Sequence, residues 1–249
     1  MTTKKMLHIV QTQLATDLNC TLADLNGKQG SFVFTEARDN PGRRPFPRGA
    51  HHFEMLTMGG TIIVSASTDI LTFIKPMLEG KDHNEAFSMP FVYGQSVYYL
   101  PDLAHIKSIA APDGFTYELV EQSEIPPLYQ HEGFRNALGY DINHPRPDVL
   151  AALAKADGHI VGMAGASIDC AKMWQVGMDV LPEYRNFGLA AYLISRLTFE
   201  TLERGYIPYY GTGTSNIASQ RVAHRVGYHP AWVCVYKGRF DGLDLSPTG

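Results

Sequence analysis

One stretch of the sequence, residues 180–193, constrains the fold of the chain more than any other. The preceding residues 173–180 form an apolar and partly alternating run of the kind that strands show. Within the stretch, leucines begin to recur every four residues from Leu189, which is the spacing of one helical face. Gly188 stands between the two patterns, where a tight turn needs backbone angles that other residues avoid. The stretch therefore predicts a strand, a turn and a helix in direct succession.

The predicted turn has the chemistry of an anion-binding site. The first N–H groups of a helix have no partners within the helix, and the helix dipole makes this end electropositive. A pyrophosphate is therefore a suitable ligand for the turn. Arg185 adds a cation at its rim, and the small side chain of Ala190 lets phosphate oxygens approach the backbone.

A second strand, turn and helix are predicted further along the chain. Residues 207–212 read as a strand, and Ser215 or Asn216 is a suitable N-cap for the helix that follows. Gly227 suits the C-terminal cap of that helix. The two predicted helices thus each begin directly after a strand.

These residues carry a resemblance to a known family. Arg185-x-x-Gly188-x-Ala190 resembles the acyl-CoA signature of the GNAT superfamily of N-acetyltransferases, written Arg/Gln-x-x-Gly-x-Gly/Ala. The segment 216–228 resembles the GNAT segment in which an Asn opens a helix beside CoA and a Gly–aromatic pair closes it. Because both motifs occur in order, the C-terminal half is identified as a member of this superfamily. The whole chain also resembles a GNAT subfamily with an additional N-terminal region, in which the stretch 40–44 recurs.

The predicted elements divide into two domains. Pro112-Asp113-Gly114 reads as a turn, so we predict an N-terminal α/β region at 1–112 and a GNAT acetyltransferase domain at 113–249. The expected fold class is α/β, with a mixed sheet that has helices on its faces. The N-terminal region is expected to wall the acceptor cleft. Its predicted elements are a helix at 4–18, a helix start at Thr21-x-x-Asp24, strands at 31–35, 52–58 and 61–66, a hairpin turn at Gly59-Gly60, and a helix from Ser67 or Thr68 that Pro76 kinks or ends. In the C-terminal domain we predict strands at 115–120, 149–154, 160–168, 207–212 and 232–236, and a helical segment at 124–138 that Pro126-Pro127 and Gly133 loosen.

Composition excludes several classes of partner. The net charge of −4 and the pI near 6.2 give no electrostatic footprint for nucleic acid or for an anionic membrane. No stretch reaches the roughly 18 apolar residues of a membrane span. Three cysteines without a CxxC pair indicate neither a disulfide framework nor a structural zinc site, and they fit a cytoplasmic setting. A second copy of the chain is carried as a candidate partner, although the residues do not decide the oligomeric state.

Residues 40–50 form a loop rich in arginine and proline. One interpretation is a basic loop that contacts an anionic substrate or a CoA phosphate; the other is a solvated connection stiffened by proline, which charge runs more often are. His51 and His52 follow the loop, but neither HExxH nor a carboxylate–histidine cluster surrounds them. We therefore predict no metal site.

The resemblance implies where acetyl-CoA, the expected co-substrate, binds. In the GNAT fold the strand ending at Val180 and the strand from Ile207 splay apart, and the pantetheine arm inserts between them. One backbone N–H on the first of these strands would polarise the thioester carbonyl. The implied cofactor-binding residues are Met178, Asp179, Val180, Arg185, Asn186, Phe187, Gly188, Leu189, Ala190, Asn216 and Ser219.

The catalytic acid and base are less defined than the cofactor site. The family often places a Tyr seven residues after the Asn, to protonate the CoA thiolate, but this chain has Ala223 there. Substitutes for the acid are His224, Tyr228, Tyr209 and Tyr210. The family sometimes uses a carboxylate early on the first splayed strand, where this chain has Trp174 and Gln175. The candidates for the base are therefore Glu54, Asp169, Asp179 and a water relay. Among the candidate acids and bases, the predicted catalytic residues are Tyr228, His224 and Glu54.

Three functions compete on these grounds. The first is an acetyl-CoA-dependent N-acetyltransferase that acetylates the amine of a small molecule directly. The second is an acyl-CoA-binding sensor or scaffold without turnover, which Ala223 and the absent base favour. The third is a protein N-acetyltransferase, which requires a long open acceptor groove. The sequence decides neither the acceptor nor the preferred acyl chain.

Overall fold

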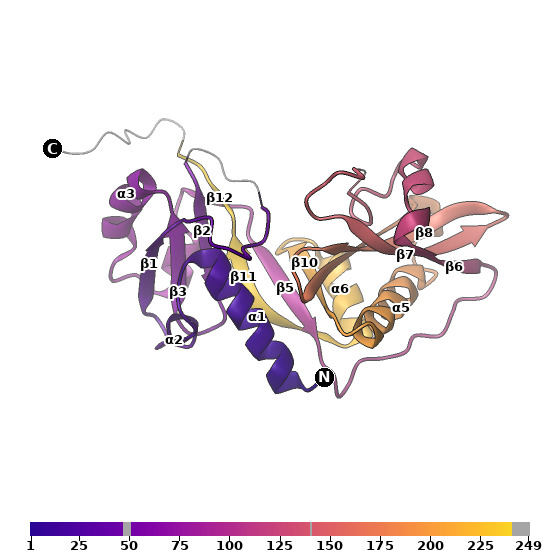
Figure 1. Ribbon diagram of the computed structural model, residues 1–249, viewed down its shortest axis with the longest axis horizontal. Coiled ribbons are helices and arrows are strands. Elements are labelled where there is room, and N and C mark those ends of the chain that lie inside the picture. Colours follow the sequence, from indigo (N-terminus) through magenta and orange to yellow (C-terminus); the bar gives the residue numbers. More distant parts are fainter. Residues whose placement is uncertain (47–50, 140, 241–249) are drawn as a thin grey trace. The chain divides into compact units, whose positions relative to one another are not determined.

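The computed structural model describes residues 1–46, 51–139 and 141–240 (Figure 1). The chain divides into two compact units. One, here called the N-terminal unit, consists of residues 7–98 and the chain from residue 230 onward. The other, here called the C-terminal unit, consists of residues 1–6 and 99–229. This division does not test the predicted domain boundary after residue 112, which stays a prediction.

The N-terminal unit combines short helices with strands of both directions. Its helices are α1 (Thr3–Leu18, whose first residues belong to the other unit), α2 (Leu22–Leu25), α3 (Thr68–Leu78) and α4 (His83–Phe87). Its strands are β1 (Phe32–Glu36), β2 (Phe53–Thr57), β3 (Ile62–Ala66), β4 (Val92–Tyr93) and β12 (Lys237–Gly238), while β5 (Ser96–Pro101) and β11 (Tyr228–Val235) have residues in both units. β1 is parallel to β3, and β2 is antiparallel to both β3 and β11.

Local sequence signals in this unit are confirmed. The Thr21 side chain accepts a hydrogen bond from the backbone N–H of Asp24, and the Asp24 carboxylate accepts one from the backbone N–H of Thr21, which is the reciprocal capping box. The predicted helix at 4–18 is α1, and Gly59-Gly60 joins β2 to β3. Pro76 lies inside α3, which ends two residues later. Ile70 and Ile74 of α3 are fully buried in the core of this unit.

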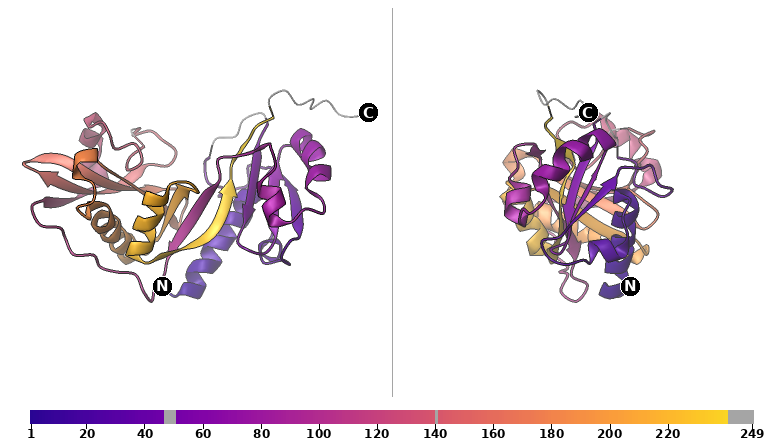
Figure 2. Two further views of the ribbon diagram at one scale, coloured as in Figure 1. Left: turned by 180° about the vertical axis from the view of Figure 1, so that it is seen from behind. Right: turned by 90° about the vertical axis from the view of Figure 1, so that its left-hand side faces the viewer.

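The C-terminal unit is a mixed sheet with helices on both faces. Its strands, in the order β10-β9-β8-β7-β6 across the sheet, are β6 (Thr116–Glu121), β7 (Asp148–Ala156), β8 (His159–Ile168), β9 (Met173–Val180) and β10 (Ile207–Gly213). β6 to β9 pair antiparallel, and β9 pairs parallel with β10. Helices α5 (Leu189–Glu203) and α6 (Ile217–Val226) cover one face, as Figure 2 shows from behind. This is the α/β class that the sequence predicts.

The predicted helical segment at 124–138 is wrong. The structure has two 3-10 helices there, η1 (Gln122–Glu124) and η2 (Pro126–Gln130), and turns from residue 131 onward. Pro126 and Pro127 supply no backbone N–H, so they suit only the start of a helix. Gly133 then takes a φ of 94°, which an α-helix does not allow. This irregular segment lies on the face of the sheet opposite α5 (Figure 1).

The end of the irregular segment lies in backbone contact with two strands. A Cβ atom placed on Gly165 of β8 would be 1.9 Å from the carbonyl oxygen of Ala137, and one on Gly177 of β9 would be 1.9 Å from that of Asn136. The two glycines are register partners across the β8–β9 pair. Only a residue without a side chain fits at either position. The two glycines therefore let the backbone of residues 136 and 137 pack directly against the strands.

We expect Gly165→Ala to destabilise the protein by about 3 kcal/mol, because the clash is with backbone rather than with a flexible side chain. Urea unfolding followed by circular dichroism measures the change. Gly213→Ala is the matched control, since a Cβ at Gly213 meets no atom within 4 Å. Equal stability of the Gly165→Ala variant and the wild type would contradict the close approach.

Candidate functional site

The parallel strands β9 and β10 are paired over only part of their length. In the described part of the chain their register runs from Ile207 opposite Met173 to Tyr210 opposite Val176. β9 continues four residues beyond this register to Val180, and β10 continues to Gly213. The backbone edge of β9 that faces away from β8 therefore leaves its sheet partner after Val176. Such an edge offers N–H and C=O groups to an extended ligand.

The turn after β9 has the backbone that its sequence predicts. The 3-10 helix η3 (Pro182–Tyr184) follows the strand, and α5 then begins with Gly188 as its N-cap. Gly188 has a φ of 89°, and Asn186 also takes the left-handed conformation, with a φ of 68°. Non-glycine residues rarely adopt that conformation, and Asn is among those that tolerate it best. Arg185 is exposed, and its Nε donates to the carbonyl oxygen of Val180 at 3.3 Å.

The start of α5 suits an anion. Gly188 has no side chain that accepts hydrogen bonds from the first N–H groups of the helix. Ala190, in the first turn, adds only a methyl group, and the guanidinium of Arg185 adds positive charge nearby. Anion-binding N–H groups and an open strand edge thus occur on consecutive segments of the chain, which is a fit for a ligand with a pyrophosphate and an extended amide arm.

The start of α6 forms a second part of the site. Asn216 caps the helix, as predicted, because its Oδ1 accepts a hydrogen bond from the backbone N–H of Ser219 at 3.1 Å. The Ser219 hydroxyl lies 2.5 Å from the hydroxyl of Tyr210. Tyr210 is the last residue of β10 in register with β9, so its phenol lies between the splayed strands and the first turn of α6. Burial, the largest cause, raises the pKa of Tyr210 above its ordinary range.

The predicted catalytic residues occupy three different environments. Tyr228 is buried, and its hydroxyl is 2.8 Å from that of Thr198 on α5; burial raises its pKa. His224 is exposed on α6, with its ring edge-on to Tyr99 at 5.5 Å between centroids. Glu54 belongs to the N-terminal unit. Their catalytic roles stay predictions.

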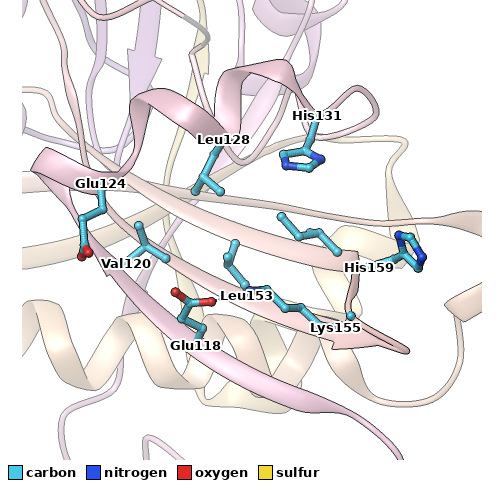
Figure 3. A pocket seen from close by; sticks show the side chains of 10 residues that line it. Glu118, Val120, Glu124, Leu128, His131, Leu153, Lys155 and His159 are labelled. Carbon is cyan, nitrogen blue, oxygen red and sulfur yellow. Dashed lines mark hydrogen bonds and ion pairs between the residues drawn. The ribbon is translucent and has the colours of Figure 1, made fainter.

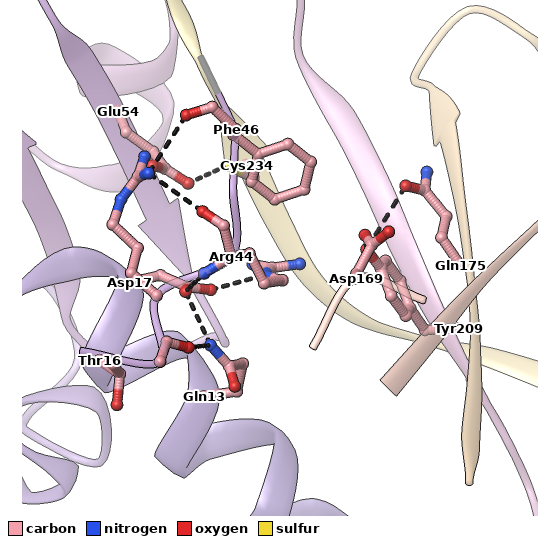
Figure 4. A network of polar contacts seen from close by, with 12 residues as sticks. Gln13, Thr16, Asp17, Arg44, Phe46, Glu54, Asp169, Gln175, Tyr209 and Cys234 are labelled. Atoms are coloured by element: carbon pink, nitrogen blue, oxygen red, sulfur yellow. Dashed lines mark hydrogen bonds and ion pairs between the residues drawn. The ribbon is translucent and has the colours of Figure 1, made fainter. Parts of the chain in front are cut away.

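Glu54 is buried within a polar cluster of the N-terminal unit (Figure 4). Its Oε1 accepts a hydrogen bond from Cys234 Sγ at 3.4 Å, and burial raises the pKa of its carboxyl group. In the same cluster, Arg44 Nε lies 2.5 Å from the Asp17 carboxylate, and both side chains are about 5% exposed. Arg43 donates to the carbonyl oxygen of Phe46 at 3.1 Å. Arg43 and Arg44 thus hold the loop to its own unit; Arg48 lies outside the described residues.

The side chain of Asp179 is hydrogen-bonded to the irregular segment on the face of the sheet opposite α5. Its carboxylate accepts hydrogen bonds from the backbone N–H groups of Asn136 at 2.7 Å and of Ala137 at 3.2 Å. It also accepts one from the Asn136 side chain at 2.6 Å. The Asp179 side chain therefore fixes the end of β9, while its backbone belongs to the splayed part of the strand.

The same face carries a buried cluster of polar side chains that the sequence did not predict. The hydroxyl of Tyr209 donates to the carboxylate of Asp169, and both residues are almost fully buried. Arg146 Nη1 lies 3.4 Å from Asp169 and 3.2 Å from Gln175 Oε1. No spacing in the sequence links these residues, because Arg146 comes from a loop before β7 and the others from three different segments. Within this cluster the phenol of Tyr209, one of the candidate acids, donates its proton in a hydrogen bond to Asp169.

A separate pocket of about 340 Å³ lies between the two 3-10 helices and the strands β6 to β8 (Figure 3). Its lining combines an apolar floor with charged groups, among them the ion pair of Lys155 with Glu118 at 2.5 Å. None of the predicted site residues lines it.

Among residues 1–46, 51–139 and 141–240, every helix is too short or too polar to span a bilayer. No group of three or more His, Cys, Asp or Glu residues suited to a metal ion occurs in those ranges.

The fold and the site together define an α/β protein with a splayed parallel strand pair and a turn whose backbone suits an anion. A model of the acetyltransferase (GNAT) family matches residues 115–228, which include the splayed strands, the turn and both helices. Residues 115–228 therefore match a GNAT acetyltransferase domain, and a further region of the chain precedes them.

Several solved structures are also similar to this chain. A GCN5-related N-acetyltransferase-like protein from Streptococcus suis 89/1591 is 18% identical, with a TM-score of 0.46, over 67% of this chain and 75% of that one. GCN5-related N-acetyltransferases from Kribbella flavida (20% identity, TM-score 0.42, 58% and 57% of the two chains) and Sphaerobacter thermophilus (16%, 0.48, 71% and 59%) are also similar. The chain spans less than two thirds of the length of the Kribbella and Sphaerobacter proteins. No curated protein matches it significantly.

We expect Gly188→Glu to abolish the thermal stabilisation that CoA gives, because a bulky anion would occupy the place of the pyrophosphate. Gly188→Ala is the matched control: it imposes the same backbone strain at a φ of 89° without adding charge. Differential scanning fluorimetry with and without CoA measures both. A folded Gly188→Glu variant that CoA stabilises as much as it does Gly188→Ala would disprove the assignment of the turn.

Proposed function

We propose that the protein is an acetyl-CoA-dependent N-acetyltransferase that transfers the acetyl group directly to the amine of a small molecule. The observation that carries the proposal is the edge of β9 that leaves β10 after Val176 and runs into the turn before α5. Within a domain that matches the GNAT family, this edge suits the pantetheine arm and the turn suits the pyrophosphate.

Acetyl-CoA supplies an activated acyl group as a thioester. The chain holds it through the N–H groups at the start of α5 and through the backbone of Met178 to Val180, where one N–H polarises the thioester carbonyl. Asp179 is expected to contribute by its position, since its carboxylate anchors this part of β9 to residues 136 and 137. Asn216 and Ser219 border the arm from the first turn of α6.

Tyr210 is the best placed of the candidate acids. A carbon–nitrogen bond forms as the acceptor amine attacks, the carbon–sulfur bond breaks, and the sulfur takes a proton from the Tyr210 hydroxyl, while the amine gives its proton to water. All three phenols are hydrogen-bonded: Tyr210 to Ser219, Tyr209 to Asp169 and Tyr228 to Thr198. Tyr210 differs in position, because the register of β9 with β10 ends at this residue. Its raised pKa keeps the proton available at neutral pH.

The proposal also covers the acceptor and the cellular compartment. We infer a small amine as the acceptor, with a second copy of the chain as a candidate partner. The net charge of −4 favours neither nucleic acid nor an anionic membrane as a partner. Three cysteines without a CxxC pair fit a reducing compartment such as the cytoplasm.

A CoA-dependent sensor without turnover is the second candidate. It is favoured by Ala223, a fully buried residue without a titratable group where the family often has a Tyr. Thermal stabilisation by acetyl-CoA supports both candidates, so turnover separates them.

We expect thiol release from acetyl-CoA, followed with a thiol reagent, to depend on an added amine from a panel of amines, amino acids and aminoglycosides. The control omits the acceptor and reports hydrolysis alone. Thermal stabilisation without release across the panel would favour the sensor.

We expect Tyr210→Phe to lower kcat about 100-fold with little change in the Kd of acetyl-CoA, since a general acid contributes about that much. In the wild type, kcat should fall only at alkaline pH, above the ordinary pKa of a tyrosine, because rising pH removes the proton. Tyr228→Phe is the companion variant: it should keep kcat and lose about 1 kcal/mol of stability with the hydrogen bond to Thr198. The reverse pattern would make Tyr228 the acid.

A further inference from the structure

The anion-binding turn carries an exposed aromatic side chain. Phe187 is 59% exposed, although large apolar side chains gain free energy when they are buried. It stands between Asn186 and Gly188, which both have left-handed backbone conformations. The backbone on either side of Phe187 is thus held in angles that few residues adopt, and the ring is carried on the outside of the turn.

Phe187 is the end of a chain of three aromatic rings, in which Phe115 contacts both Phe187 and Tyr184. The ring of Phe115, just before β6, lies 5.9 Å from that of Phe187 at an angle of 69° between planes, and 6.2 Å from that of Tyr184 at 76°. Edge-to-face contacts of this kind stabilise aromatic pairs beyond the area that they bury. Phe115 and Tyr184 are only partly exposed, so Phe115 is held by Tyr184 and contacts one side of the Phe187 ring, which stays 59% exposed.

The segment that carries Phe115 is itself anchored near the turn. The Tyr117 hydroxyl donates to the carbonyl oxygen of Pro112 at 2.7 Å, which ties residues 112–117 together. Pro112 Cγ lies 3.7 Å from the point where a Cβ of Gly188 would be. The start of β6 therefore borders the same turn that we assign to the pyrophosphate.

We propose that Phe187 is the stacking platform for the adenine ring of CoA. The inference rests on the proposed function, since it takes the pyrophosphate to lie at the start of α5. In CoA a single ribose separates the pyrophosphate from the adenine, so the base must lie close to the turn. An aromatic ring with an open surface beside that turn offers the adenine a π-face, and stacking on such a ring needs no hydrogen-bond partner.

The chemistry of the site favours adenine over the acceptor amine as the occupant. The acceptor must reach the thioester, which the arm places along β9 beside Tyr210. Phe187 is part of the turn itself and lies next to Phe115. With the arm along β9 and the pyrophosphate at the turn, the nucleotide is the remaining part of CoA, so it is the part that we assign to Phe187.

The experiment compares whole CoA with its two halves. Isothermal titration calorimetry measures the binding of CoA, of 4′-phosphopantetheine, which lacks adenosine, and of adenosine 3′,5′-bisphosphate, which lacks the arm. The full chain is used as wild type, Phe187→Ala and Phe187→Tyr. Ile142→Ala is the control for loss of an exposed apolar side chain in the same unit, since Ile142 is 64% exposed.

Phe187→Ala should weaken the binding of CoA and of adenosine 3′,5′-bisphosphate about tenfold each, the size of a lost base–aromatic stack. It should leave 4′-phosphopantetheine binding unchanged, and Phe187→Tyr and Ile142→Ala should bind all three ligands like the wild type. Equal weakening of CoA and 4′-phosphopantetheine, or no weakening of either, would overturn the stacking role while leaving the proposed function intact. A wild type that does not bind CoA would overturn the proposed function and the inference with it.

Discussion

The close approach of residues 136 and 137 to the β8–β9 pair determines how the C-terminal unit presents its site. Two facing glycines, Gly165 and Gly177, allow backbone carbonyls to lie where any side chain would clash. The Asp179 carboxylate then accepts hydrogen bonds from the backbone of the same segment. One face of β9 is thereby fixed by backbone contacts. Because β9 is anchored from this face and from β8, its remaining edge can part from β10 without loss of order.

The parting of two parallel strands would ordinarily leave backbone groups without partners inside the sheet. Such groups are costly when they are buried, so a splayed pair is stable only where water or a ligand satisfies them. In this domain the strands part directly before an electropositive turn. Tyr210 is the last residue of β10 that is in register with β9. The proposed ligand meets each of these requirements with a different part of its structure: amides for the strand edge, pyrophosphate for the turn and sulfur for the phenol.

The two arginines of the loop at residues 40–46 show how burial changes the meaning of a charge run. In sequence they resemble a basic surface that awaits an anionic ligand. In the structure Arg44 is paired with Asp17 inside the N-terminal unit, and Arg43 donates to backbone carbonyls of its own loop. A buried guanidinium needs such partners because an unpaired charge is expensive to remove from water. These contacts favour the structural interpretation of Arg43 and Arg44.

The sequence by itself determined the elements whose signals are local. The turn at Gly188, the cap at Asn216, the hairpin at Gly59-Gly60 and the capping box at Thr21 each depend on residues within one or two turns of chain, so their chemistry can be read directly. The family resemblance rests on two of these same signals. The helical prediction at 124–138 failed because two prolines and a glycine, which were expected only to loosen the helix, restrict it to short 3-10 turns.

Only the tertiary structure decided which polar side chains remain available. Tyr209 and Tyr210 are neighbours in sequence, but strand alternation sends one hydroxyl to Asp169 and the other to Ser219. Tyr228 is placed against Thr198, and Phe187 against Phe115, by packing between segments about 30 and 70 residues apart in the chain. Sequence patterns report what a residue can do within its own element. The partner and the surroundings that a side chain meets depend on how distant elements pack.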